Sequence, residues 1–174
     1  MSCISTLLLL LIIVAGVSVS WLKVLIFPSL LAIIILALCA LWLLRNAKAV
    51  ENIELIDSRM FSLKEAAIIA GTLTIIQAGI YGLNLLLGDA GLIAGTLLAS
   101  LFEIHAAAAA VVIQGDPTNS TLLYAMILGL GAHAISKSIN ATLTGGWKFA
   151  RVFVPVQILH MLVLISVLCW ITLR

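Results

Sequence analysis

Residues 98–112 read LASLFEIHAAAAAVV, which places two ionisable side chains, Glu103 and His105, in the middle of the apolar run 89–114. A run of this length can lie in the hydrocarbon core of a bilayer, where an ionisable group is costly and points to function. On a regular helix, two residues apart means about 200° of rotation, so the two side chains would point to different sides. His105 then faces a different neighbour, a second subunit, or a local break in the helix.

The composition is that of an integral membrane protein. Of the 174 residues, 64% are hydrophobic and 9% are charged, and the mean hydropathy is +1.30. This composition excludes a soluble domain, and a net charge of +2 gives no basic surface for nucleic acid. Cys3, Cys39 and Cys169 lack metal-binding spacing and are interpreted as small apolar side chains.

The apolar runs predict an all-α transmembrane bundle of about six spans, which forms one integral-membrane domain over residues 1–174. This domain comprises two apolar spans in 1–44, a charged loop in 45–62, and four spans with polar stripes in 63–174. The predicted spans are 3–21, 24–44, 63–87, 90–113, 120–143 and 149–172. One long kinked helix is the alternative for the first pair, because almost no loop separates them.

Six spans would put both termini on the same side of the membrane as the 45–64 loop. That side would carry Arg45, Lys48, Arg59, Lys64 and Arg174, and the other side Lys23, Lys148 and Arg151. The positive-inside rule therefore favours cytoplasmic termini, although the bias is slight and insertion in both orientations stays open. The loop itself is interpreted either as a short surface helix or as a solvated linker. The tryptophans lie near predicted span ends, as in an aromatic belt: Trp21, Trp42, Trp147 and Trp170.

Polar side chains on the last four spans share one depth. At about 1.5 Å rise per residue, four of them lie roughly 15–21 Å from one end of the bundle: Gln77, Glu103, His133 and His160. Lys137 and Tyr81 lie at roughly 9–10 Å. One polar group per span near the midplane is the geometry of a binding or relay layer. The candidate residues for ion binding or transport are Glu103, His105, His133, Lys137, His160, Gln77 and Gln157.

Structural interpretations of these residues stay open. Glu103 can be a partner of Lys137 or a protonated, hydrogen-bonded acid, and Lys137 can extend toward the membrane surface. A membrane histidine is often only a satisfied hydrogen-bonding group. Small residues on one face of the fourth span predict close helix packing: Gly91, Gly95 and Ala99.

Catalytic motifs are missing from the sequence, which contains no HExxH, GxSxG, Walker or Rossmann pattern. An enzyme is therefore the least favoured class. No cofactor is expected. Imidazole and carboxylate could bind a divalent cation, but the spacing assigns no metal ligands.

Four short runs resemble a bacterial integral-membrane family catalogued as domain of unknown function 4010: residues 88–92, 98–110, 136–137 and 145–150. The resemblance is close over 61–151 and looser over 20–172. The acidic position of that family is usually Asp, and here it is Glu103. The family often follows an MgtC/SapB-type domain, which is absent here, as is the first half of the family's own domain. The resemblance implies a bacterial inner-membrane protein linked to ion homeostasis, and a homodimer that restores the missing half.

The leading interpretation is binding or transport of a cation or proton through the polar layer. Glu103 would bear the charge, His105 and His133 would be ligands or relay partners, and Lys137 would hold Glu103 ionised. His160 completes the layer, which Gln77 and Gln157 would line. The alternative is a non-transporting regulatory subunit that docks on another membrane protein. A water-accessible cavity reaching Glu103 favours transport, whereas a dry and fully paired layer favours a partner.

Overall fold

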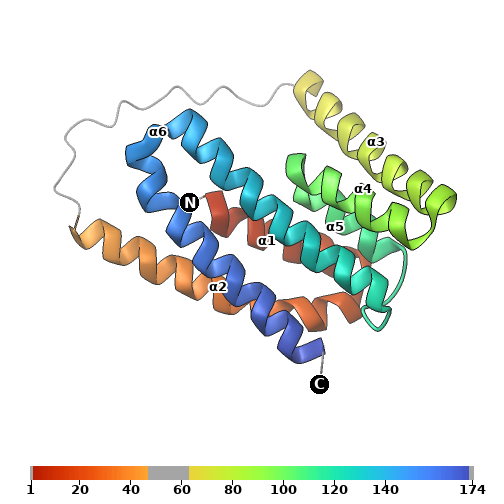
Figure 1. Ribbon diagram of the computed structural model, residues 1–174, viewed down its shortest axis with the longest axis horizontal. Coiled ribbons are helices and arrows are strands. Elements are labelled where there is room, and N and C mark those ends of the chain that lie inside the picture. The colour runs from red at the N-terminus through yellow and green to blue at the C-terminus, as the bar shows by residue number, and fades with distance from the viewer. Residues whose placement is uncertain (1, 47–62, 173–174) are drawn as a thin grey trace.

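The computed structural model describes residues 2–46 and 63–172 (Figure 1). These residues form α-helices and no strands, which confirms the predicted all-α class. The helices are α1 Ser2–Val17, α2 Val19–Asn46, α3 Leu63–Leu87, α4 Asp89–Phe102, α5 Ile104–Ile113 and α6 Ser120–Thr172. Most of the predicted loop 45–62, with its surface-helix alternative, lies outside the described residues.

Helix α6 consists of two arms that meet at Gly146. The backbone of Gly146 has φ 70° and ψ 172°, a conformation that glycine adopts without a steric penalty. The arms, residues 120–145 and 147–172, together line one apolar groove that includes Ile135 and Leu162, so they pack antiparallel. The predicted gap between the spans 120–143 and 149–172 contains Gly146 and agrees with this geometry.

Helices α1 and α2 turn back on each other at Ser18, the one non-helical residue between them. Cys3 and Ile4 line a groove with Leu36 and Leu43, which a single continuous helix would place tens of ångströms away. The alternative of one long helix is therefore wrong. The reversal comes earlier than the predicted boundary near residue 22, because Trp21 is fully buried and its Nε1 donates to the Gly115 carbonyl at 2.6 Å.

The predicted fourth span, 90–113, is instead a helical hairpin formed by α4 and α5. Gly91 packs against the backbone of Leu83, and the neighbouring Asn84 donates a hydrogen bond to the side chain of Gln114. A straight helix would separate residues 91 and 114 by about 35 Å, so α4 and α5 must fold back at Glu103. The prediction of one continuous span is wrong here, because the chain returns to the end of the bundle from which it started.

This hairpin changes the topology. Thr172 lies beside Pro117 and Ser120, whereas Cys3, near the start of α1, lies beside Phe149, just after Gly146. The two ends of the described chain are thus at opposite ends of the bundle (Figure 1), and the prediction that both termini share one side is wrong. The hairpin also changes the predicted count of six spans, because 90–113 is not one span. Three helices are long and apolar enough to cross a membrane, at Val19–Leu43, Ala70–Leu87 and Ser120–Thr172, and the last of them consists of the two arms that meet at Gly146. Helices α1, α4 and α5 are shorter.

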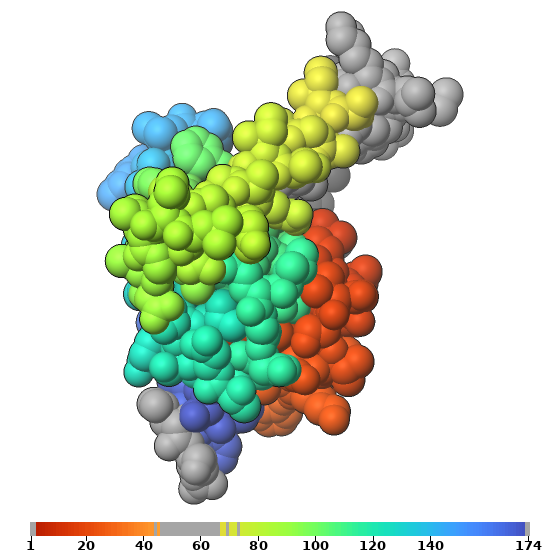
Figure 2. Space-filling view, turned by 90° about the vertical axis from the view of Figure 1, so that its right-hand side faces the viewer, coloured from red at the N-terminus to blue at the C-terminus, as the bar shows by residue number. Residues whose placement is uncertain are grey.

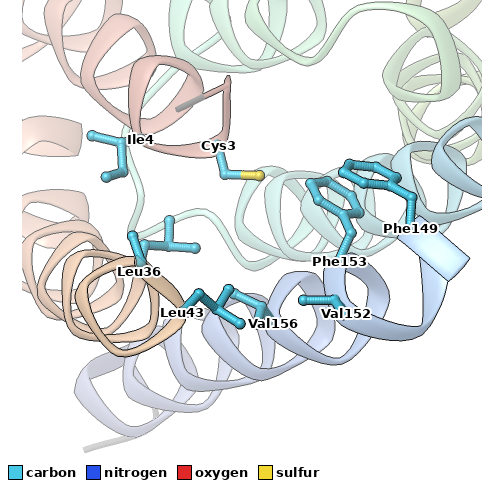
Figure 3. A pocket seen from close by; sticks show the side chains of 9 residues that line it. Cys3, Ile4, Leu36, Leu43, Phe149, Val152, Phe153 and Val156 are labelled. Carbon is cyan, nitrogen blue, oxygen red and sulfur yellow. The ribbon is translucent and has the colours of Figure 1, made fainter. Parts of the chain in front are cut away.

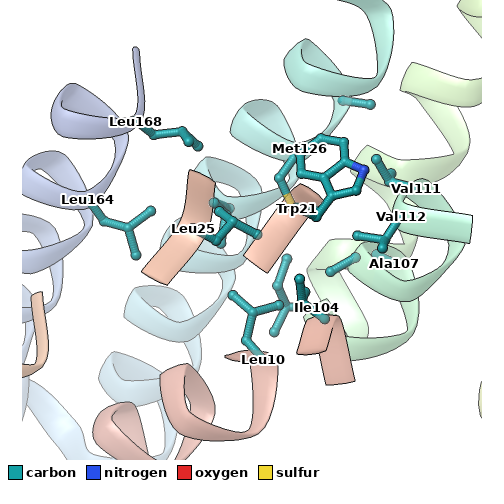
Figure 4. Close-up of a cluster of buried hydrophobic side chains, with 14 of the residues drawn as sticks. Leu10, Trp21, Leu25, Ile104, Ala107, Val111, Val112, Met126, Leu164 and Leu168 are labelled. Atoms are coloured by element: carbon teal, nitrogen blue, oxygen red, sulfur yellow. The ribbon is translucent and has the colours of Figure 1, made fainter. Parts of the chain in front are cut away.

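The core joins the two hairpins to α6. Leu10 and Trp21 pack with Ile104, Met126 and Leu164 in one buried cluster (Figure 4). Figure 2 shows α3 on the outside of the bundle, where most of its described side chains are exposed. The hairpin tip at Glu103, which joins α4 to α5, lies next to α1 and the first arm of α6.

Cysteine labelling tests the hairpin. In a variant free of native cysteines, Ala90→Cys and Asp116→Cys flank α4 and α5, and both should react with a membrane-impermeant maleimide from the same side of the membrane. Lys148→Cys, at the other end of the bundle, should react from the opposite side. Reaction of positions 90 and 116 from opposite sides would show that 90–113 crosses the membrane as a single span.

Candidate functional site

Glu103 closes the hairpin and caps the second of its helices. Its backbone is extended, at φ −148° and ψ 104°, and its carboxylate accepts a hydrogen bond of 2.9 Å from the backbone N–H of His105. The same carboxylate oxygen contacts Nδ1 of His105. Two residues that would diverge on a regular helix are therefore paired, because the helix is broken between them.

The second ring nitrogen of His105 faces α1, where Nε2 lies 3.1 Å from the backbone carbonyl oxygen of Thr6. A carbonyl can only accept, so Nε2 carries a hydrogen. The contact between Nδ1 and the carboxylate of Glu103 needs one more hydrogen, on the nitrogen if Glu103 is ionised and on the oxygen if His105 is neutral. The Glu103–His105 pair thus holds one transferable proton between two side chains.

The break also leaves carbonyl groups at the end of α4 without helical partners. Two side chains of α6 lie against them: Nδ1 of His133 is 3.2 Å from the Ser100 carbonyl oxygen, and Oγ of Ser136 donates to the Leu101 carbonyl at 2.5 Å. In an apolar environment an unpaired carbonyl costs several kcal/mol. His133 and Ser136 therefore stabilise the broken backbone.

A cavity of about 10 Å³, enough for about one water molecule, lies beside the tip and is lined by residues of α1, α5 and both arms of α6. Its polar lining consists of Cys3, Thr6, His133, Lys137, Gln157 and His160. Nζ of Lys137 donates to Oγ1 of Thr6 at 2.7 Å, and Sγ of Cys3 donates to Oε1 of Gln157 at 3.0 Å. Thr6 thus links the Glu103–His105 pair, through its carbonyl, to this cavity, through its hydroxyl.

Two histidines at this cavity each have Nδ1 beside a backbone carbonyl. For His160 the acceptor is the Val156 carbonyl at 2.8 Å, and for His133 it is the Ser100 carbonyl. Nδ1 must carry the hydrogen in both rings, so in the neutral form Nε2 has a free lone pair. Nε2 of His133 is buried without a hydrogen-bond partner. It is a ready acceptor for a water or a proton in the cavity.

The structure places the candidate residues in three groups. Glu103 and His105 form the pair at the tip, and His133, Lys137, Gln157 and His160 line the cavity. Gln77 is half-buried and Tyr81 is exposed, both on the outer helix α3 away from this cavity. The ammonium of Lys137 donates to Thr6, and its predicted role in holding Glu103 ionised stays a prediction.

Sequence reasoning missed Cys3 and Thr6, and it noted Ser136 only within the run 136–137 that resembles the family. Cys3 and Thr6 lie at i and i+3 on a span that was interpreted as apolar, and this spacing was the available signal. Gly91 and Gly95, on the small-residue face, contact α3. A Cβ atom on Gly91 would lie 2.6 Å from the Leu83 carbonyl carbon, and Ala99 is buried on the same helix.

Within the described residues 2–46 and 63–172, no group of three or more His, Cys, Asp or Glu side chains is arranged to hold a metal ion. His133 and His160 each donate Nδ1–H to a backbone carbonyl and keep Nε2 as an acceptor. A lysine ammonium shares their cavity, and its charge would repel a divalent cation there.

Replacing Ser136 with Ala should destabilise the hairpin tip by about 1 kcal/mol, because the Leu101 carbonyl loses its donor. Ser138→Ala is the matched control, since Oγ of Ser138 donates to the carbonyl of Ala134 four residues earlier in its own helix, at 2.8 Å. Thermal unfolding in detergent should show a lower Tm for Ser136→Ala and little change for Ser138→Ala. Equal Tm values for the two variants would contradict this role of Ser136.

Comparison with known families gives one match, in which the family described as "Domain of unknown function (DUF4010)" matches residues 1–145. The match begins earlier than the resemblance seen in the sequence and covers α1 to α5 and the first arm of α6. No curated protein and no solved structure matches the chain. The links to an MgtC/SapB-type domain and to half of a larger domain stay predictions.

Proposed function

This chain belongs to the DUF4010 family, and from its own geometry we propose that it moves protons across a bacterial inner membrane. Within the broader class of cation transport, the proton is the species that the site supports best. The observation that carries the proposal is the contact of both ring nitrogens of His105 with oxygens, one of them on Glu103. Such a pair stores one proton and exchanges it without a change of fold.

The position of the pair supports this proposal. Helices α4 and α5 have 14 and 10 residues, so the tip lies roughly 15–21 Å from the end where the hairpin begins. That is about the middle of a hydrocarbon core of about 30 Å. Non-helical backbone persists at this depth only when protein buries it or when it lines a path for water or ions. Broken helices of this kind form the substrate sites of many transporters.

The cavity gives the proton a next position. The Thr6 carbonyl only accepts, so it orients the His105 ring and does not pass the proton on. A water in the cavity, which His133 and His160 line, would have to carry the proton onward from His105. Glu103 and His105 form the entry of this path, and His133, Lys137 and His160 its inner part.

The regulatory-subunit alternative is favoured by two observations. The cavity lies beside Ile104 and does not extend to Glu103, and the side chain of Glu103 is 35% exposed on the outside of the bundle. A carboxylate facing lipid costs at least about 3 kcal/mol on insertion scales. A second protein surface packed over Glu103 would shield the carboxylate from lipid and remove that cost. This holds for a transporter and for a regulatory subunit alike.

Proton flux in proteoliposomes separates the two functions. Glu103→Gln keeps an oxygen that accepts from the His105 backbone but loses the exchangeable acid, so proton flux should fall by about 100-fold or more between about pH 5 and about pH 8. Asp116→Asn, which removes an exposed acid at the end of the bundle, should conduct like the natural chain. No flux of protons or of several other cations by the natural chain would overturn transport and favour the regulatory role.

A homodimer that covers Glu103 is the second part of the proposal. Phe102, next to Glu103, is 82% exposed, and Leu98 on the same helix is 59% exposed. A second copy packed on this face would shield the carboxylate from lipid. A parallel and an inverted arrangement of the two copies would both cover the carboxylate.

Disulfide cross-linking tests this dimer. In a variant free of native cysteines, Phe102→Cys should form a disulfide with position 102 of the second copy in membranes. This holds for a parallel and for an inverted dimer, provided that the two-fold axis passes near the hairpin tip. Leu86→Cys, equally exposed at 82% but on α3, should not cross-link. Absence of cross-linking at position 102 together with a monomeric mass in detergent would contradict the dimer.

A further inference from the structure

A second site lies between α1, α2 and the second arm of α6, next to the polar cavity, with which it shares the lining residue Cys3. It is a groove of about 200 Å³, open on one side and lined by apolar side chains that include Ile4, Leu36, Leu43, Phe149, Val152 and Val156 (Figure 3). The rings of Phe149 and Phe153 stack with centroids 5.3 Å apart and stiffen one wall. In a bilayer, a groove of this kind binds hydrocarbon, because no lining residue offers a charged group to another ligand.

The end of the groove near Gly146 is strongly basic. Lys148 and Arg151 flank the lining residues Phe149 and Val152 along α6, and Arg45 follows Leu43 at the end of α2. All three cations are exposed, and segments 32–46 and 140–156 contain no acidic residue. These two segments therefore carry only positive charge, while the acidic residues Glu51, Glu54 and Asp57 follow Arg45 in segment 47–62, outside the described residues.

Tryptophans mark the same end as the level of the lipid headgroups. Trp42 is 66% exposed and Trp147 is 65% exposed, as expected for an aromatic belt. The guanidinium of Arg151 lies 5.5 Å from the centroid of the Trp147 ring, a contact that holds the cation at this level. An apolar groove thus runs inward from a cluster of cations at the membrane surface.

We propose that this groove binds an anionic phospholipid, with one acyl chain between α2 and α6 and the phosphate beside Lys148 and Arg151. The apolar wall alone would accept the chain of any phospholipid. The three cations select a headgroup with net negative charge, because a guanidinium and an ammonium both bind phosphate oxygens and a zwitterionic headgroup carries its own cation. None of the three cations belongs to the Glu103–His105 pair or to the polar cavity.

Lipid binding to the purified full chain in detergent tests the proposal. Phosphatidylglycerol and phosphatidylcholine with identical acyl chains serve as probes, and binding is measured by native mass spectrometry and by the rise in Tm. Phosphatidylglycerol should bind more tightly and raise Tm further. The double variant Lys148→Gln/Arg151→Gln should weaken phosphatidylglycerol binding by about 30-fold and leave phosphatidylcholine binding unchanged.

Two further variants make the result specific. Lys23→Gln removes an exposed cation at the opposite end of the bundle and should bind both lipids like the natural chain. Val152→Trp fills the groove and should weaken binding of both lipids. Equal binding of the two lipids by the natural chain, or full phosphatidylglycerol binding by the double variant or by Val152→Trp, would overturn the proposal.

Discussion

The need to satisfy backbone carbonyls at the break near Glu103 governs this structure. A helix interrupted inside an apolar bundle exposes groups that water cannot reach, so protein side chains must bind them. Here α6 contributes His133 and Ser136, and α1 presents the Thr6 carbonyl to the His105 ring. The polar residues of α6 meet this requirement, whereas α1 supplies an acceptor for the ring N–H of His105.

Much of the helical framework could be predicted because local signals agree with it. The third helix was predicted at 63–87 and lies there, and the kink at Gly146 falls between the predicted spans 120–143 and 149–172. The break at Glu103 could not be predicted, because 98–112 contains neither Pro nor Gly and every residue there is compatible with a continuous helix. Tertiary contacts determine where the helix breaks. The sequence contains one hint, because Glu103 and His105 would point to different sides of a regular helix, and a local break was one of the explanations considered.

Most residues of the candidate site could be predicted from the sequence, but their arrangement in space could not. The rise per residue of a regular helix predicted that His133 and His160 lie at the same depth, and both line the same cavity. Depth alone gives neither the rotation of a helix nor its neighbours, which is why Gln77 lies elsewhere on an outer helix. The polar side chains of α1 were overlooked because Cys3 and Thr6 are isolated in a strongly apolar sequence, and only packing shows that they face α6.

The alanine run of α5 has a consequence for how the chain is made. Ala106 to Ala110 are all at most 5% exposed, and the helix that carries them has 10 residues, too few to cross a bilayer alone. Its partners on α6 are synthesised after it. Helices α1, α3 and α4, which also contact α5, are made earlier, so the contacts with α6 are the last that the hairpin gains during synthesis.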